Sequence, residues 1–414
     1  MNYNEIELDS VITDIAAGPF GSNLKVECFV PSGFPIIDGA NLKGYKVTDN
    51  VTKFVTEEKA RSLHRAIAKR GDVIVTISGT LGQIAYVPDD SQYAEYLCSQ
   101  RQFRVTFDTE RVYVPFLVFY FHTYEGQNKI LSFANQTGVP ALSQPLKNFR
   151  KIKIALPKYE EQRRIASIVE AINNRAETNN KINDNLQQQL ATIYKSWYQD
   201  FSLVANEELV ETEYGLIPKG WHYAFLGDLC KSISVTHKFD KEELIFLNTG
   251  DIENGRFLHS NFMSVKEMPG QAKKTIAPGD ILYSEIRPIN RHFAFVNFPS
   301  VDYVVSTKLM VIRTQSFDSM RLYHYLTSDS VLAELQLQAE SRSGTFPQIR
   351  FDNVSRLPIL IADKQTEKVF IDLLHTVYAQ IEHINRENEK LTELRDNLLP
   401  KLMSGEIDVS DIQL

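Results

Sequence analysis

The side chains that could do chemistry in this chain are basic groups and amides gathered in a few short stretches. One stretch, residues 287–292, places two arginines beside an asparagine. Arginine, asparagine and glutamine can form paired hydrogen bonds with the edges of nucleic acid bases, whereas lysine suits phosphate. Taken singly, each such residue is more simply explained as solvated surface or as half of a salt bridge. We single out as candidates for contact with nucleic acid Lys25, Arg101, Gln102, Lys129, Lys147, Arg287, Asn290, Arg291, Arg342 and Arg350.

Sequence motifs of catalysis and metal binding are weak in this chain. The segment from Gly18 to Lys25 lacks the spacing of a phosphate-binding loop, so a plain glycine turn explains it better. Asp49 with Glu57 and Lys59 fits the acidic pattern of metal-dependent nucleases only loosely, and a solvated helix start explains it better. The nine histidines form no HxH or HxxxH pair, and the three cysteines form no CxxC pair. We therefore predict no catalytic residue, no metal site and no cofactor bound by this chain itself.

The net charge of −7 at first argues against nucleic acid as a partner. Residues 1–156 hold 17 basic and 16 acidic side chains and residues 201–361 hold 16 and 19, whereas residues 362–414 hold 6 and 11. Most of the excess acid therefore lies near the C-terminal end, and the near-neutral parts can still present a basic face. With no apolar run of membrane-spanning length and no signal-peptide pattern, we expect a cytoplasmic location and no membrane partner.

The sequence segments that must position these residues occur twice in the chain. Residues 41–44 match 251–255, residues 71–75 match 279–283, and residues 148–154 match 353–359. Each copy then enters a long helical pattern. The offset falls steadily from 210 through 208 to 205. Such a drift indicates two copies that diverged by small changes of loop length, because chance matches would scatter.

Each copy is predicted to be a mixed α/β globule followed by a long helix, which gives an α+β fold with an internal pseudo-two-fold repeat. The expected parts are a globule over residues 1–157, a helix over 158–200, a linker and second globule over 201–362, and a helix with a tail over 363–414. Short strands bounded by turn residues are expected at 73–78, 84–87, 103–107, 281–284, 293–298 and 304–313, with helices at 115–124 and 319–326. The pattern does not indicate how the strands pair.

Both long segments carry apolar residues at alternating spacings of four and three, which is typical of a coiled-coil seam. Each segment of about 40 residues would form a helix roughly 60 Å long. If the two copies pack about a two-fold axis, the helices run antiparallel as a spacer between the globules. The expected seam residues are Ile165, Val169, Ile172, Leu186, Leu190, Ile193 and Trp197 in the first helix and Leu373, Val377, Ile381, Ile384, Leu391, Leu394 and Leu398 in the second.

Polar residues interrupt both seams. Asn179 and Asn183 do so in the first helix and residues 385–389 in the second. In an antiparallel pair these two intervals meet. Buried asparagines there would lock the register of the helices; an equally good explanation is that the middle of the pair is solvated or covered by another subunit.

With these elements in place, the sequence resembles the specificity (S) subunit of type I restriction-modification systems. The resemblance is carried by residues 18–25, 78–82, 154–157 and 161–165 in the first half, and by residues 215–221, 247–252, 279–282, 287–288 and 402–407 in the second. It covers essentially the whole chain in order. One departure is that Glu161 and Gln162, at the start of the first helix, have no match within residues 362–366, so any partner contact at the second helix start stays open.

The resemblance implies a non-catalytic subunit with two target-recognition domains, each reading one half of a bipartite, asymmetric site in double-stranded DNA. It implies helices that set the spacing and dock two modification (methyltransferase) subunits, which use S-adenosylmethionine. It also implies restriction subunits, which use ATP and magnesium to translocate and cleave DNA. The alternatives are a coiled-coil scaffold that binds only protein, a methyltransferase or nuclease acting alone, and the specificity subunit of a fused restriction-methylation enzyme.

Overall fold

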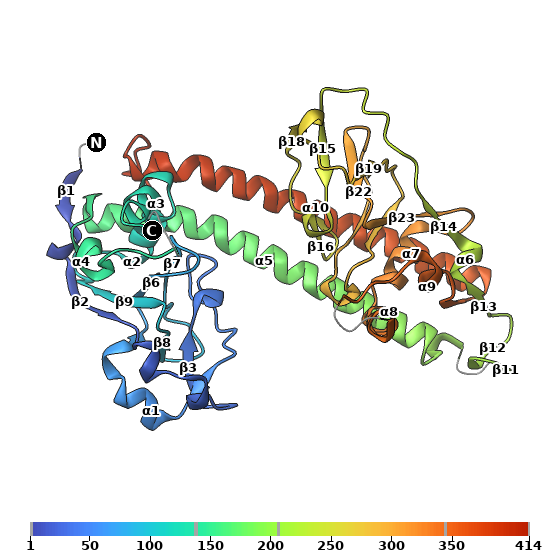
Figure 1. Ribbon diagram of the computed structural model, residues 1–414, viewed down its shortest axis with the longest axis horizontal. Coiled ribbons are helices and arrows are strands. Elements are labelled where there is room, and N and C mark those ends of the chain that lie inside the picture. Colours follow the sequence, from blue (N-terminus) through green and yellow to red (C-terminus); the bar gives the residue numbers. More distant parts are fainter. Residues whose placement is uncertain (1–2, 136–139, 205–207, 343–345, 413–414) are drawn as a thin grey trace. The chain divides into compact units, whose positions relative to one another are not determined.

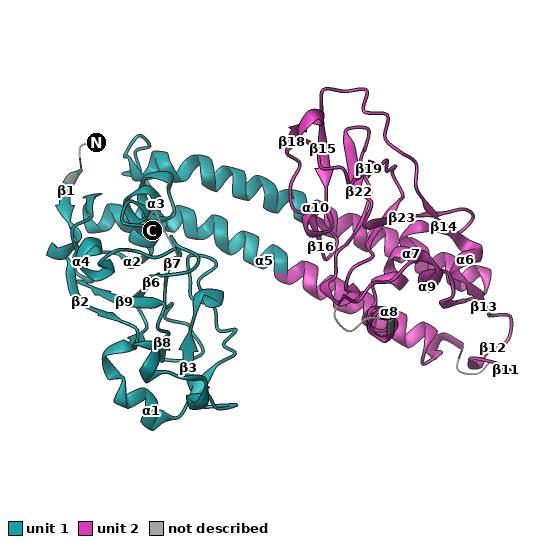
Figure 2. Cartoon of the chain, viewed as in Figure 1, with its two compact units in different colours: residues 1–180, 385–414 teal, residues 181–384 magenta. Residues whose placement is uncertain are grey.

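The computed structural model of the protein describes residues 3–135, 140–204, 208–342 and 346–412 (Figure 1). The chain forms two compact units, residues 1–180 with 385–414 and residues 181–384 (Figure 2). Each unit contains one globular domain together with a stretch of both long helices. Because the units cut through both helices, the boundaries expected from the sequence for the separate elements stay predictions.

Two four-stranded sheets form the first domain. The first sheet has the order β2-β9-β6-β7 with antiparallel neighbours, and its strands are β2 (Ile12–Ala17), β6 (Val73–Thr76), β7 (Ile84–Tyr86) and β9 (Gln102–Phe107). The second has the order β4-β3-β8-β5, and its strands are β3 (Phe34–Ile37), β4 (Phe54–Val55), β5 (Ile67–Lys69) and β8 (Glu95–Cys98). Strands β3 and β8 run parallel to each other. A separate antiparallel pair joins β1 (Asn4–Glu7) to β10 (Lys153–Leu156).

The helices of the first domain are α1 (Glu57–Ser62), α2 (Val114–Phe121), α3 (Tyr124–Leu131) and α4 (Pro145–Arg150). Helix α2 is apolar on every face, and all its residues except Pro115 are buried. A helix of that composition belongs inside a core. It shares one hydrophobic cluster with Phe103 of β9 and Phe149 of α4, which hold the sheet and helices together.

The second domain is built from the same parts. Its first sheet has the order β14-β23-β20-β21, with β14 (Cys230–Ile233), β20 (Ile281–Ser284), β21 (Phe293–Phe295) and β23 (Leu309–Thr314). Its second has the order β18-β15-β22-β19, with β15 (Glu243–Leu247), β18 (Phe262–Ser264), β19 (Ala272–Lys274) and β22 (Tyr303–Ser306). Further pairs join β13 (His222–Phe225) to β24 (Pro358–Ile361), β11 (Leu209–Thr212) to β12 (Gly215–Pro218), and β16 (Ile252–Glu253) to β17 (Arg256–Phe257). The helices are α6 (Leu226–Leu229), α7 (Ser319–Leu326), α8 (Asp329–Arg342) and α9 (Phe351–Ser355).

The strand orders confirm the predicted duplication and the α+β class. Both sheets of the second domain have the same strand order as the sheets of the first. The parallel pair of β15 and β22 corresponds to the parallel pair of β3 and β8. Two details of the sequence prediction are wrong. The strand expected at 304–313 is two strands, β22 and β23, because a turn at Thr307 and Lys308 divides it. The helix expected at 115–124 ends at Phe121, and α3 begins at Tyr124.

The turn before the central strand is the same in both domains. Gly71 and Gly279 adopt φ values of +85° and +91°, which favour glycine. The carboxylates that follow are buried: Asp72 accepts a hydrogen bond from the Lys69 amide at 2.9 Å, and Asp280 accepts one from the Ala277 amide at 2.7 Å. The two matching glycine-aspartate pairs of the sequence therefore close the same turn.

A capping box follows β3 in the first domain and β15 in the second, with its aspartate and asparagine exchanged. After β3, the Asn41 side chain accepts a hydrogen bond from the Asp38 amide, and Asp38 caps the following turn. After β15, Asp251 accepts from the Asn248 amide, and Asn248 caps the turn. The carboxylate and the amide have changed places while the hydrogen-bond pattern has stayed.

The two long helices, α5 (Tyr159–Tyr198) and α10 (Lys364–Met403), are 40 residues each. Of the expected seam residues, Ile165, Val169, Leu190, Ile381 and Ile384 are buried; Ile172, Leu186, Ile193, Trp197, Leu373, Val377, Leu391 and Leu398 are partly buried. Leu394 is 47% exposed, so its place in the seam was wrongly predicted. An α-helix drifts out of a strict seven-residue repeat, and the end of α10 buries Leu399 and Leu402 in the first-domain core instead. No helix in the described residues is long and apolar enough to cross a membrane.

The polar intervals of α5 and α10 meet within the first unit, as an antiparallel pair requires. Asn179, only 1% exposed, donates a hydrogen bond from Nδ2 to Asn388 Oδ1 at 2.9 Å. Asn388 in turn donates to Asn180 Oδ1 at 3.1 Å, and Arg175 pairs with Glu387 at 2.9 Å. The asparagine contact is specific to one register, because sliding either helix by a residue would separate these amides.

The two long helices begin with different buried groups at their fourth residues. In α5 this residue is Gln162, which accepts a hydrogen bond from the Tyr113 amide and donates to the Arg111 and Pro157 carbonyl oxygens. In α10 it is Glu367, which pairs with the fully buried Arg321 of α7, Nε to Oε1 at 2.9 Å. The second helix start, which departs from the sequence pattern of the first, is thus anchored by an ion pair where the first uses an amide.

Candidate nucleic-acid interface

Three loops of the first domain meet at one end of the strands of the sheet β2-β9-β6-β7, where β2 and β6 end and β9 begins. We call this the sheet edge. Ala17, the last residue of β2, pairs with Phe103, and Thr76, the last of β6, pairs with Gln102 at the start of β9. The loops that follow β2 and β6 and the loop that precedes β9 must therefore lie together. The Gly18 amide donates to the Gln102 carbonyl oxygen at 2.8 Å, and the Ile77 amide to the Arg101 carbonyl oxygen at 2.7 Å.

Gly18 shows how closely these loops pack. A Cβ atom at this position would lie 1.9 Å from the Ser99 carbonyl oxygen, so only glycine fits. The glycine-rich segment that begins at residue 18 is thus a loop pressed against its neighbour, in keeping with the glycine turn expected from the sequence.

The same edge exists in the second domain. Ser284, the last residue of β20, pairs with Leu309, the first of β23, so the loops after β20 and before β23 meet there. The Glu285 amide donates to the Lys308 carbonyl oxygen at 3.0 Å, which is the counterpart of the bond from Ile77 to Arg101. The duplicated fold therefore gives each domain an equivalent edge built from loops.

The structure brings part of the predicted first-domain set to this edge. Lys25 lies in the loop after β2 and Arg101 in the loop before β9, and both are exposed. Gln102 is only 1% exposed and its side chain bonds to Ser99 Oγ. In this conformation the Gln102 side chain is therefore not accessible to nucleic acid, because it points to the covered face of the sheet.

Two predicted residues of the first domain lie on helices instead. Lys129 of α3 donates to the Lys153 carbonyl oxygen at 2.7 Å and pairs with Glu125 at 2.8 Å, so it ties α3 to β10. Lys147 of α4 is exposed. Neither belongs to the loops at the sheet edge, and their role in nucleic-acid contact stays a prediction.

In the second domain, three predicted residues share the loop after β20. Arg287 and Asn290 are exposed, and Arg291 forms an ion pair with Asp329 at the start of α8. Arg350 is also exposed and follows Gln348, which bridges to Ile286 at the base of the loop. Arg342 is the last residue of α8, and its side chain lies outside the described residues.

The backbone of this loop has two left-handed positions that the sequence pattern did not predict. Arg287 and Arg291 both adopt left-handed conformations, with φ of +43° and +56°. In the first domain the corresponding loop contains Gly79 and Gly82, with φ of +98° and +86°. Two glycines in a loop indicate positive φ values already in the sequence. Arginine rarely adopts a positive φ, so only the structure shows it here.

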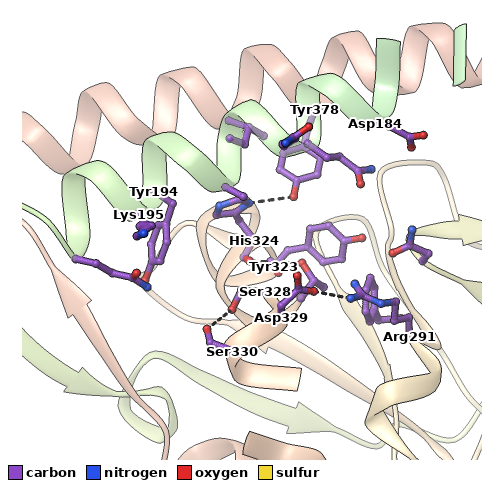
Figure 3. A pocket seen from close by; sticks show the side chains of 18 residues that line it. Asp184, Tyr194, Lys195, Arg291, Tyr323, His324, Ser328, Asp329, Ser330 and Tyr378 are labelled. Atoms are coloured by element: carbon purple, nitrogen blue, oxygen red, sulfur yellow. Dashed lines mark hydrogen bonds and ion pairs between the residues drawn. The ribbon is translucent and has the colours of Figure 1, made fainter. Parts of the chain in front are cut away.

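A groove of about 540 Å³ lies beside this loop in the second unit (Figure 3). Arg291 and Asp329 line one side, and Tyr194 and Lys195 of α5 line another. His324 Nδ1 lies 3.2 Å from the Tyr378 hydroxyl, and burial lowers the pKa of His324 to about 3. This imidazole is neutral near pH 7 and faces tyrosines, so it is an aromatic packing partner in the groove wall.

No group of three or more side chains suited to hold a metal ion occurs in the part of the chain that the structure describes. The free thiols of Cys98 and Cys230 are buried, and burial raises the pKa of each to about 12, which keeps them protonated and unreactive. At both sheet edges, exposed loops carry hydrogen-bond donors.

Comparison with known proteins agrees with this architecture. The family model of the type I restriction modification DNA specificity domain matches residues 28–188 and again residues 218–393. The HindI specificity subunit of Haemophilus influenzae is 42% identical over 181 residues, which span 43% of this chain and 39% of that relative. The MjaIX specificity subunit of Methanocaldococcus jannaschii is 21% identical over 97% of this chain and 93% of its own.

Among solved structures, the S subunit of a type I restriction-modification system from M. genitalium has a similar fold. The TM-score is 0.56 with 14% sequence identity, over 97% of this chain and 96% of that one. The two family matches cover most of the chain and coincide with its two repeats. The chain thus belongs to the family of type I restriction-modification specificity subunits.

Proposed function

We propose that this chain selects the DNA target of a type I restriction-modification complex, with each domain reading one half of a bipartite site in double-stranded DNA. The observation that carries the proposal is the repeated sheet edge, at which both domains expose basic loops: Lys25 and Arg101 in one, Arg287 and Asn290 in the other. Direct base recognition needs such donors on surfaces that can enter a groove.

The two half-sites should differ in sequence. The loop after β6 in the first domain is built on glycines, whereas the equivalent loop in the second carries two arginines and an asparagine. Different donors at equivalent places select different bases. The target is therefore asymmetric rather than palindromic.

The long helices α5 and α10 would set the distance between half-sites and dock two methyltransferase subunits. The Asn179–Asn388 contact supports this role, because a fixed register gives a spacer of fixed length. We assign catalysis to partners: methyltransferase subunits with S-adenosylmethionine, and restriction subunits with ATP and magnesium, acting in the cytoplasm. This chain itself would bind none of these cofactors.

The net charge of −7 fits a division of labour in this complex. Non-specific affinity for DNA comes largely from phosphate contacts, which partner subunits can supply, while this chain contributes base discrimination. We expect the isolated chain to bind DNA weakly and in a salt-sensitive way, and the assembled complex to bind tightly.

Mapping of N6-methyladenine in the host genome tests the proposal. Deleting the gene for this chain should abolish methylation at one bipartite, asymmetric motif. Replacing residues 1–157 with the corresponding domain of another specificity subunit should change one half of that motif and leave the other half and the spacing intact. A genome whose methylation does not depend on this chain would refute the proposal.

A further inference from the structure

The loops after β6 and β20 share one backbone framework, which allows their residues to be matched. The Gly79 amide donates to the Pro140 carbonyl oxygen at 3.1 Å, and the Arg287 amide donates to the Pro347 carbonyl oxygen at 3.2 Å. Gly79 and Arg287 are therefore equivalent positions. Arg101 and Lys308 are equivalent for the same reason. The carbonyl oxygen of each accepts a hydrogen bond from the amide of the residue that follows the central strand, β6 or β20.

Arg287 occupies a backbone conformation that suits glycine. Its φ of +43° is positive, as is that of Gly79, at +98°. A side chain in this region costs stability relative to glycine, and such strain persists where the side chain has a use. Yet the Arg287 guanidinium is exposed and forms no hydrogen bond or ion pair with any described residue, so no contact within the described part of the chain accounts for this side chain.

In the first domain, a guanidinium reaches the same place from a different residue. Arg101 Nη1 lies 3.8 Å from the point that a Cβ of Gly79 would occupy. It too is exposed, and its side chain has no hydrogen-bond or ionic partner among the described residues. In the second domain the counterpart Lys308 lies 3.8 Å from the Glu285 carboxylate, whereas the Arg287 guanidinium has no partner among the described residues.

We infer that Arg101 and Arg287 are the guanine-reading side chains of the first and second domains, one for each half-site. This inference rests on the proposed function and names the base that it recognises. Guanidinium donors match the O6 and N7 acceptors of guanine in the major groove, and a bidentate contact discriminates against another base by roughly 5- to 150-fold. The same position over the same loop would thus serve both domains.

The test uses the full chain expressed with its methyltransferase subunits, and the readout is the N6-methyladenine motif of the host genome. Arg287→Ala should relax a guanine position in the half-site read by the second domain, by roughly 5- to 150-fold in methylation preference, and leave the other half unchanged. Arg101→Ala should do the converse. The control is Arg70→Ala, whose guanidinium donates to the Ser91 carbonyl oxygen at the opposite end of β6, and it should leave both halves unchanged.

Arg287→Gly separates a reading role from a structural one. Removing the strained side chain should leave the second unit at least as stable, while the guanine preference falls as it does for alanine. Unaltered motifs in Arg101→Ala and Arg287→Ala, or loss of stability in Arg287→Gly, would overturn the inference. If no motif depends on this chain at all, the proposed function itself fails, which is a different result.

Discussion

The ion pair that anchors α10 gives the sharpest prediction on stability. Glu367→Gln installs the residue type that α5 has at the same position, but it leaves the Arg321 guanidinium, 0% exposed, without its carboxylate partner. The lost group also accepts hydrogen bonds from the Tyr198 hydroxyl at 2.7 Å and the Ala362 amide at 3.1 Å. Removing one partner of a buried pair costs roughly 3–5 kcal/mol. We expect a loss of that size in the free energy of unfolding of the second unit.

Tryptophan fluorescence during urea unfolding measures this loss selectively. The chain has two tryptophans, Trp197 and Trp221, and both lie in the second unit close to the pair. The control is the double variant Arg321→Met with Glu367→Gln, which removes both charges and should recover most of the lost stability. A loss under 1 kcal/mol in the single variant, or a double variant as unstable as the single one, would refute this account.

Two further predictions concern a buried imidazole and a closely packed glycine. His324 has a pKa of about 3 in the fold but about 6.5 when unfolded, so the unfolded chain gains a proton first and stability falls as the pH drops below 6.5. Between pH 7 and pH 5 this group should lower the free energy of unfolding of the second unit by about 2 kcal/mol, measured by tryptophan fluorescence during urea unfolding. His324 is the sixth residue of α7, as Phe119 is the sixth residue of α2, and His324→Phe should flatten the pH dependence. An unchanged slope would contradict this prediction. Gly18→Ala should lower methylation at the first-domain half-site, because its Cβ would clash with the Ser99 carbonyl oxygen. The control is Gly44→Ala, which has open space around its Cβ and should leave methylation unchanged. Equal effects of the two substitutions would contradict the packing argument.

The sequence alone predicted what periodicity and repetition encode. The duplication, the two long helices and strands such as β20 follow from local pattern, and the meeting of Asn179 with Asn388 follows from antiparallel symmetry. Strand pairing was out of reach, since β3 and β8 are parallel partners some 60 residues apart along the chain. No period in the sequence records such a contact.

The candidate site was predictable in kind but less so in detail. Arg101 and Arg287 were singled out because arginine beside amides is a recognisable chemical set, and the structure leaves both exposed on loops. Gln102 satisfied the same pattern and proved to be buried, because composition does not say which way a strand residue points. The left-handed backbone of Arg287 carries no sequence signal and is seen only in the structure.

The exchanged cap residues of the two domains constrain how this gene can change. In the first domain, Asn41 also donates from Nδ2 to the Thr48 and Asn50 carbonyl oxygens, so Asn41→Asp alone would lose both bonds and set a second carboxylate beside Asp38. An exchange that begins with Asn41→Asp therefore passes through a poorly satisfied pair, whereas one that begins with Asp38→Asn keeps the Asn41 bonds and leaves an asparagine cap such as Asn248. Neutral drift should therefore exchange the two residues through the asparagine pair and avoid the aspartate pair.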